Sequence, residues 1–299
     1  MNILLTGGNG FIGSSFRLSS PHKIFPLYRN VNYSYKENSV FIDLTNKKHI
    51  INLVSDLRNL KIDAIVHTAA ITPFSLKNKL NYHHDIVMAE HIIYLVEKLN
   101  IRKVLFTSGW NIYDPLSHIP IKENSDLKPN TDYGISKMKV EAIFKNSLKH
   151  AFLINVRFSS IYGPKQTSSG LIPNSVHSAF KSHTITINSL NTKRDYLYIG
   201  DTMTAMNKLL SLSRKQLLDI NIGSGTSYSV QTIITIIQQI MKKKYNIDVT
   251  LILKINPTET VPADNRLDIS KARQVINFEP STKLINGLEN YIAWIKQNE

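Results

Sequence analysis

The chain has no cysteine among its 299 residues. This excludes disulfide bonds, thiolate catalysis and cysteine-based metal sites, and it is typical of a cytoplasmic protein. A run of about 18 apolar residues, which a membrane-spanning helix needs, is also missing. The first residues lack the basic stretch and the separate apolar segment of a signal peptide. We therefore expect a cytoplasmic protein that binds no metal and does not associate with a membrane.

Acidic residues are scarce: 22 Asp and Glu face 36 Lys and Arg, which gives a formal net charge of +14. A basic balance of this kind can indicate binding to nucleic acid, to an acidic membrane surface or to small anionic ligands. The basic residues are scattered, however, and the longest run is Lys242–Lys244. No zinc-finger spacing or aromatic-interleaved basic stripe is present. We interpret the charge as a solvated basic surface that favours phosphorylated ligands, and we predict no nucleic-acid partner.

The first eighteen residues combine three signals. Asn2–Thr6 is a short apolar run that predicts a buried strand, a glycine-rich turn follows, and Ser14–Leu18 can continue as a helix. This order suits a dinucleotide pyrophosphate, because glycine lets the backbone approach the phosphates and the helix start offers free N–H groups. The glycines fit both G-x-G-x-x-G and G-x-x-G-x-x-G, and an ordinary strand–helix turn is the alternative. The cofactor-binding residues predicted here are Gly7, Gly10, Phe11, Ile12 and Gly13.

Arg29 ends the second apolar run, Lys23–Arg29. In a nucleotide-binding βαβ unit, an acid at this position binds a ribose 2′-hydroxyl, whereas arginine accommodates a 2′-phosphate. The sequence therefore favours NADP as the cofactor, with NAD left open. An exposed loop arginine without a cofactor role is the alternative.

Strands and helices alternate along the first half of the chain. Val40–Leu44, Asp63–His67 and Ile101–Ser108 predict strands, and the segments up to Leu60 and over 81–100 predict helices. This pattern predicts an α/β fold with a Rossmann-type, doubly wound parallel sheet, whose ligands bind beyond the carboxyl ends of the strands. The residues at those ends that we expect beside the cofactor are Asp43, Leu44, Thr68, Ala69, Ala70, Thr107, Ser108, Gly109, Trp110 and Asn111.

Tyr133 and Lys137 stand four residues apart at the start of a predicted helix. Residues at this spacing share one helix face. A nearby ammonium favours the phenolate, so we expect Lys137 to lower the tyrosine pKa from its usual value near 10. The pair would then donate or accept a proton near neutral pH. We predict that both residues are catalytic and contact the cofactor.

Further stretches extend these motifs along nearly the whole chain: His67–Ala70, Arg157–Pro164, Arg194–Asp201, Asn221–Gly225 and Arg266–Arg273. Together with the glycine turn and the tyrosine–lysine pair, they resemble the extended short-chain dehydrogenase/reductase family. The similarity is to its nucleotide-sugar epimerases, dehydratases and reductases.

This resemblance implies a domain organisation. Residues 1–164 would form an NADP-binding Rossmann domain, to which residues 193–215 would return. Residues 165–299 would form a smaller mixed α/β domain that covers the sugar nucleotide. A homodimer is also implied, through helices near residues 85–99 and 134–148.

The resemblance also implies roles for individual residues. Tyr133 would be the general acid/base, and Lys137 would hold the nicotinamide ribose. The family places a serine or threonine hydroxyl at the position of Gly109, so either Ser108 or Thr107 would take that role here, and we choose Ser108. The predicted substrate contacts are Thr107, Gly109, Trp110, Asn111, Ser160, Arg194 and Arg266.

Trp110 and Asn111 occupy the positions at which family dehydratases carry an Asp-Glu pair. Neither side chain can act as a carboxylate acid or base, so 4,6-dehydration is disfavoured. We therefore expect a reductase of a nucleotide-linked 4-keto-6-deoxysugar, in deoxysugar and polysaccharide synthesis. An epimerase with a retained cofactor, and a cofactor-binding protein without turnover, are the two alternatives.

Overall fold

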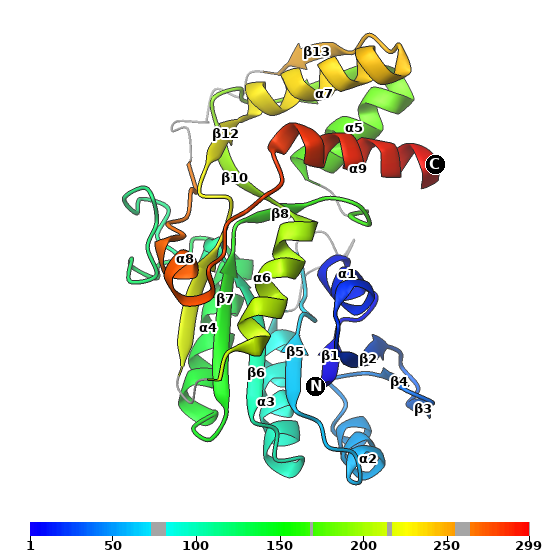
Figure 1. Cartoon of the computed structure of the whole chain (residues 1–299), viewed down its shortest axis with the longest axis vertical. Helices are drawn as coiled ribbons and strands as arrows, with labels where there is room; N and C mark the ends of the chain where they lie inside the picture. The colour runs from blue at the N-terminus through cyan, green and yellow to red at the C-terminus, as the bar shows by residue number, and fades with distance from the viewer. Residues whose placement is uncertain (73–81, 168–169, 214–216, 255–263, 299) are drawn as a thin grey trace.

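The computed structural model describes residues 1–72, 82–167, 170–213, 217–254 and 264–298. Its largest element is a sheet of eight strands (Figure 1). The strands are β1 (Asn2–Thr6), β2 (Lys23–Arg29), β3 (Ser34–Lys36), β4 (Ser39–Ile42), β5 (Ala64–His67), β6 (Lys103–Gly109), β7 (Phe152–Phe158) and β11 (Leu218–Ile222).

The strand order is β11-β7-β6-β5-β1-β2-β4-β3, and every neighbouring pair is parallel except β3 with β4. The order runs outward in both directions from β1, so the sheet is doubly wound. Ligands of such sheets bind in the crevice where the direction changes, here beside the carboxyl ends of β1 and β5. The predicted fold class is confirmed. Strand β4 corresponds to the predicted strand Val40–Leu44, whereas β3 was not predicted, because its three residues are too few to show an alternation.

In the described part of the chain, six α-helices cover the two faces of this sheet (Figure 1). On one face lie α1 (Phe11–Ser19), α6 (Ile199–Ser211) and α8 (Ser270–Ile276), and on the other lie α2 (Lys47–Leu57), α3 (His83–Lys98) and α4 (Asp132–Ser147). The predicted helices up to residue 60, over 81–100 and from residue 133 onward correspond to the second set. Among the described residues, no helix is long and apolar enough to span a bilayer.

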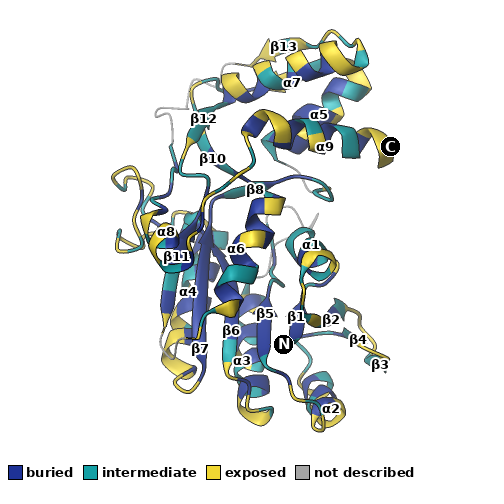
Figure 2. Ribbon diagram, in the orientation of Figure 1, coloured by how far each residue is buried: buried dark blue, intermediate teal, exposed yellow. Residues whose placement is uncertain are grey.

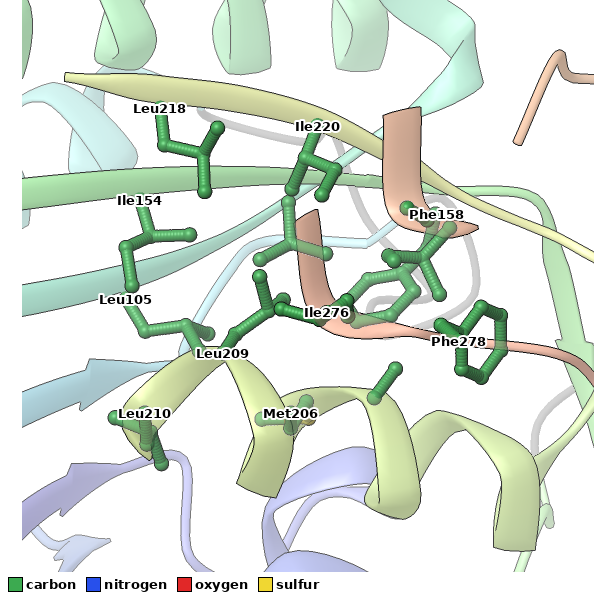
Figure 3. Close-up of a cluster of buried hydrophobic side chains, with 14 of the residues drawn as sticks. Leu105, Ile154, Phe158, Met206, Leu209, Leu210, Leu218, Ile220, Ile276 and Phe278 are labelled. Atoms are coloured by element: carbon green, nitrogen blue, oxygen red, sulfur yellow. The ribbon is translucent and has the colours of Figure 1, made fainter. Parts of the chain in front are cut away.

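Each face of the sheet has its own apolar core, because successive strand residues point to opposite sides. In β1, Ile3 and Leu5 pack with α1 and α6, whereas Leu4 packs with α2 and α3. In β6, Leu105 faces the first core and Phe106 the second. Figure 3 shows the first core, where α6 lies against side chains from β6, β7 and β11. The middle strands β5, β6 and β7 are buried along almost their whole length (Figure 2).

The remaining elements gather above the carboxyl edge of the sheet (Figure 1). Strands β12 (Ser227–Ser229), β10 (Lys193–Tyr198) and β8 (Ser160–Tyr162) form a small sheet, and β13 (Thr250–Leu253) pairs with β9 (Thr184–Ile187). Around them, α5 (Leu171–Ser182), α7 (Val230–Tyr245) and α9 (Leu284–Asn298) enclose a third apolar core. Residues 193–211 contribute to both parts, since β10 lies in the small sheet and α6 packs beside α1.

Candidate active site

A cleft of about 1090 Å³ lies between the carboxyl ends of the large sheet and the elements above it. It is lined by the glycine turn, by the ends of β2, β5 and β6, by the start of α4, and by residues of α5, β9 and β10. All the predicted site residues except Arg266 line this cleft. Arg266 is half-buried, and its carbonyl oxygen accepts a 2.8 Å hydrogen bond from Ile121 N. Its contact with substrate stays a prediction.

The glycine turn is packed so closely that Gly7 and Gly13 have no room for a side chain. Gly7 has a φ of +70°, and a Cβ added there would lie 2.8 Å from Thr68 Oγ1. A Cβ added to Gly13 would lie 2.1 Å from the Gly7 carbonyl oxygen, which is far inside contact distance. Gly10 stands directly before α1, so the amides of its first turn face the cleft. Such a cradle fits the pyrophosphate of a nicotinamide dinucleotide.

Thr6, at the end of β1, fixes the segment after β5 beside this turn. Its Oγ1 accepts hydrogen bonds of 3.1 Å from both Thr68 N and Ala69 N, and it lies 2.8 Å from His67 Nδ1. Burial and the charge of Lys137 lower the pKa of His67 to about 3, so the imidazole is neutral. His67 is a packed strand-end residue, buried against Phe106 and Phe144. The sequence did not predict that Thr6 would hold this segment. The only signal in the sequence is its position directly before the glycine turn.

Arg29 and Asp43 meet at the far end of the cleft, because β2 and β4 are neighbours. Arg29 is exposed. Burial acts to raise the pKa of Asp43, but hydrogen bonds from Thr45 and the charges of Arg29 and His49 outweigh it and hold that pKa below its usual value. Asp43 is thus ionised at neutral pH and orders the loop, with Oδ1 accepting from Thr45 N at 2.9 Å.

Tyr133 and Lys137 share one face of α4, whose start is capped by Thr131 Oγ1 accepting from Gly134 N at 3.1 Å. Lys137 is only 3 % exposed. Its Nζ donates a 2.9 Å hydrogen bond to Thr107 O and lies 5.6 Å from the Tyr133 ring centroid. Burial lowers the pKa of Lys137 to about 8. The buried ammonium therefore lies beside the phenol at the wall of the cleft.

The tyrosine pKa differs from our expectation. We expected Lys137 to lower the pKa of Tyr133, but burial raises it, and the charges of Asp85 and Tyr82 add to that rise. Burial is the main reason, because it disfavours the charged phenolate, and the buried carboxylate of Asp85 further opposes ionisation of the phenol. Asp85 carries no sequence motif that we could read, so its place beside Tyr133 was missed.

The two hydroxyl groups at the end of β6 differ in their hydrogen bonding. Thr107 Oγ1 donates to His67 O at 3.1 Å. Ser108 is 6 % exposed, and its Oγ has no hydrogen-bond partner among the described residues. A Cβ added to Gly109 would lie 3.2 Å from Asn111 Oδ1, so the asparagine amide fills the space beside the glycine. Trp110 lies under the Arg194 guanidinium, with its ring centroid 5.3 Å from Cζ.

A buried ionic network holds α4 and the loop after β6 in place. Arg157, at the carboxyl end of β7, donates from Nη2 to Glu141 Oε2 of α4 at 2.8 Å. Its Nη1 donates to Tyr113 Oη at 3.0 Å and to Glu123 O at 2.9 Å. This network therefore joins β7, α4 and the loop after β6, and each of the three contributes residues to the cleft or borders it.

The sheet, the glycine cradle and the tyrosine–lysine pair define a dinucleotide-binding enzyme. The family model described as "NAD dependent epimerase/dehydratase family" matches residues 3–223. The chain therefore belongs to the NAD dependent epimerase/dehydratase family, as the resemblance implied. Its members are enzymes, which leaves the interpretation as a cofactor-binding protein without turnover unsupported.

Relatives of similar length cover several reactions. The chain is 26% identical to an uncharacterized UDP-glucose epimerase of Bacillus subtilis, with 99% of this chain and 98% of that protein covered. It is 27% identical to a dTDP-4-dehydro-6-deoxyglucose reductase of Escherichia coli, over 98% and 97%. Its fold matches UDP-glucuronic acid 4-epimerase of Bacillus cereus, solved with UDP-glucuronic acid and NAD, with a TM-score of 0.82, 24% identity and complete coverage of both chains.

Proposed function

We propose that this protein reduces a 4-keto-6-deoxysugar linked to a nucleoside diphosphate, with NADPH as hydride donor. The observation that carries the proposal is the composition of the cleft. Tyr133 and Lys137 line the same cleft as three further cations, Arg29, Lys165 and Arg194, while Asp43 is the only acid among the described residues that line it. Anionic diphosphates suit this lining. Dehydration needs a carboxylate that faces the sugar, and among the described residues that line the cleft only Asp43, at the Arg29 end, carries one.

The residues fit a cofactor laid along the sheet edge. When bound, the dinucleotide would supply the hydride. The turn from Gly7 to Gly13 would hold its pyrophosphate, and Arg29 would pair with a 2′-phosphate. Asp43, Leu44 and the segment 68–70 would line the adenosine and pyrophosphate side, and Lys137 would contact the nicotinamide ribose.

Tyr133 would protonate the sugar oxygen as the carbonyl is reduced. Because its pKa is raised, the phenol keeps its proton at neutral pH, and this is the form that a reductase needs. The Lys137 ammonium would then stabilise the phenolate left behind. A protonated phenol suits reduction of a carbonyl, which needs an acid. It suits an epimerase less well, because the first step of that reaction removes a proton from a sugar hydroxyl group.

Ser108 would donate or accept a hydrogen bond at the same sugar oxygen. Its buried hydroxyl has no partner among the described residues, whereas Thr107 is engaged with His67 O. A buried hydroxyl without a partner is costly unless a ligand satisfies it. Trp110, Asn111, Ser160 and Arg194 would form the walls around the sugar and diphosphate.

The cofactor preference can be tested at Arg29. We expect Arg29→Ala to weaken NADPH binding by about ten- to a hundred-fold and to leave NADH binding unchanged, because one charged hydrogen bond contributes roughly 1.5–3 kcal/mol. Fluorescence titration of both nucleotides measures this, with Lys23→Ala at the opposite end of β2 as the matched control. If Arg29→Ala weakened the binding of NADPH and NADH equally, Arg29 would not recognise the 2′-phosphate.

The reaction is tested by supplying 4-keto-6-deoxy sugar nucleotides with NADPH and following nicotinamide absorbance and the sugar product. A reductase consumes one NADPH for each sugar reduced. If no NADPH is consumed with a 4-keto-6-deoxy sugar linked to any of the nucleoside diphosphates, this result would count against the proposal.

A second candidate is an epimerase with the same tyrosine and lysine. Its support is the end-to-end similarity to a relative named as an epimerase. An epimerase would interconvert two sugar nucleotides without net use of nicotinamide and would purify with its cofactor bound. Product analysis by chromatography of UDP-glucose and UDP-glucuronic acid reactions distinguishes the two candidates.

The assembly follows from the same resemblance. We infer a homodimer in the cytoplasm, formed through α3 and α4, which pack against each other on one face of the sheet. Both statements stay predictions.

A further inference from the structure

Asp85 is a buried carboxylate at the catalytic helix. It lies in the first turn of α3 and is 4 % exposed. One oxygen, Oδ1, accepts a 2.8 Å hydrogen bond from Ile71 N, in the segment after β5 that lines the cleft. The other, Oδ2, accepts a 2.8 Å hydrogen bond from Ser136 Oγ. Asp85 therefore joins α3 to α4 and to the cleft wall.

These two hydrogen bonds bring the carboxylate close to the reacting groups. Ser136 directly precedes Lys137 and follows Tyr133 by one helical turn. Tyr82 stands just before α3, and its ring centroid is 6.3 Å from that of Tyr133. Asp85 thus faces one cation and two phenols, and no salt bridge joins it to another described residue.

Among the described charged groups near Tyr133 and Lys137, Asp85 is the main buried negative charge that is not paired with a cation. Glu141, further along α4, is paired with Arg157. Asp132 is exposed, and His67 is neutral. On α3, His84 lines the cleft and His83 is exposed. A buried charge acts strongly on its neighbours, because the surrounding protein screens it poorly.

We propose that Asp85 is a positioning residue whose negative charge keeps Tyr133 as a phenol and Lys137 as an ammonium, so that it sets the pH at which the pair works. The charge of Asp85 raises the pKa of Tyr133 and opposes the fall that burial causes in the pKa of Lys137. This inference concerns the pair of the proposed function, but it does not depend on the substrate.

The test is Asp85→Asn, which keeps an acceptor for Ile71 N and a donor for Ser136 and removes the charge. We expect the ionisation midpoint of Tyr133 to move to lower pH by about one to two units. This is the usual effect of removing one nearby buried negative charge on a pKa. The midpoint is read by NMR of tyrosine labelled at Cζ, in the protein without substrate, with Tyr133→Phe to assign the signal. The alkaline limb of the reductase pH profile should move in the same direction.

Two controls separate charge from packing. Ser136→Ala removes one hydrogen bond and keeps the charge, so the midpoint should stay near that of the wild type. Asp132→Asn removes an exposed charge on the same helix and should also have little effect. An unmoved midpoint in folded Asp85→Asn, or an equal shift in Ser136→Ala, would overturn the proposal. Asp85→Ser is the second neutral variant, with the same expected shift, should the asparagine variant not fold.

The NMR readout keeps the two proposals distinct. If the midpoint shifts but no 4-keto sugar is reduced, the inference about Asp85 holds and the proposed function fails. If the sugar is reduced but the midpoint does not move, the reverse is true.

Discussion

Tyr133→Phe is expected to lower turnover of the nucleotide sugar by about 10²- to 10⁴-fold, the range that general acid catalysis contributes. The phenylalanine ring preserves the packing against Tyr82 and Lys137 and removes only the hydroxyl that transfers the proton. Dinucleotide affinity and melting temperature should therefore remain near those of the wild type. Steady-state kinetics, cofactor titration and thermal melting measure the three quantities.

Tyr113→Phe is the matched control for this experiment. Tyr113 is also a buried tyrosine, but its hydroxyl donates to Asn221 Oδ1 at 2.7 Å and accepts from Arg157. We expect this variant to lose stability, by about 1–3 kcal/mol for the unsatisfied partners, and to lose far less turnover. If Tyr133→Phe kept wild-type turnover, Tyr133 would not be the acid.

Gly13→Ala should have the second large effect. The added Cβ would lie 2.1 Å from the Gly7 carbonyl oxygen, and both atoms belong to the tightly closed turn. The backbone must move apart, so the cradle for the pyrophosphate is lost. We expect dinucleotide affinity to fall by at least about a hundred-fold and the free energy of unfolding to fall by about 1–3 kcal/mol, the usual cost of overpacking.

The neighbouring residue provides the control for the glycine. Ser14 lies one position further along α1 and is only half-buried, so Ser14→Ala should change both quantities little. Calorimetric titration with NADPH and thermal melts of the two variants test this. Wild-type affinity in Gly13→Ala would show that the turn does not hold the pyrophosphate.

Local patterns in the sequence determined the fold class and the position of the tyrosine–lysine pair. The apolar run before Gly7, the alternation of strands and helices, and the spacing of Tyr133 and Lys137 all depend on residues close together in the chain. Backbone geometry and helix periodicity act over this range, so they can be read without the fold. The family membership follows from the same stretches.

Only the tertiary structure decided the electrostatics and the hydrogen bonding of the site. Asp85 and Ser136 are 51 positions apart, and Thr6 and His67 are 61 apart, yet each pair is hydrogen-bonded. The engagement of Thr107 with the neighbouring strand is equally invisible in the sequence. The direction of the Tyr133 pKa shift was wrong in the sequence-based expectation, because it depends on burial and on a carboxylate brought in by another helix. Charge and desolvation act through space, so their balance exists only once the chain is folded.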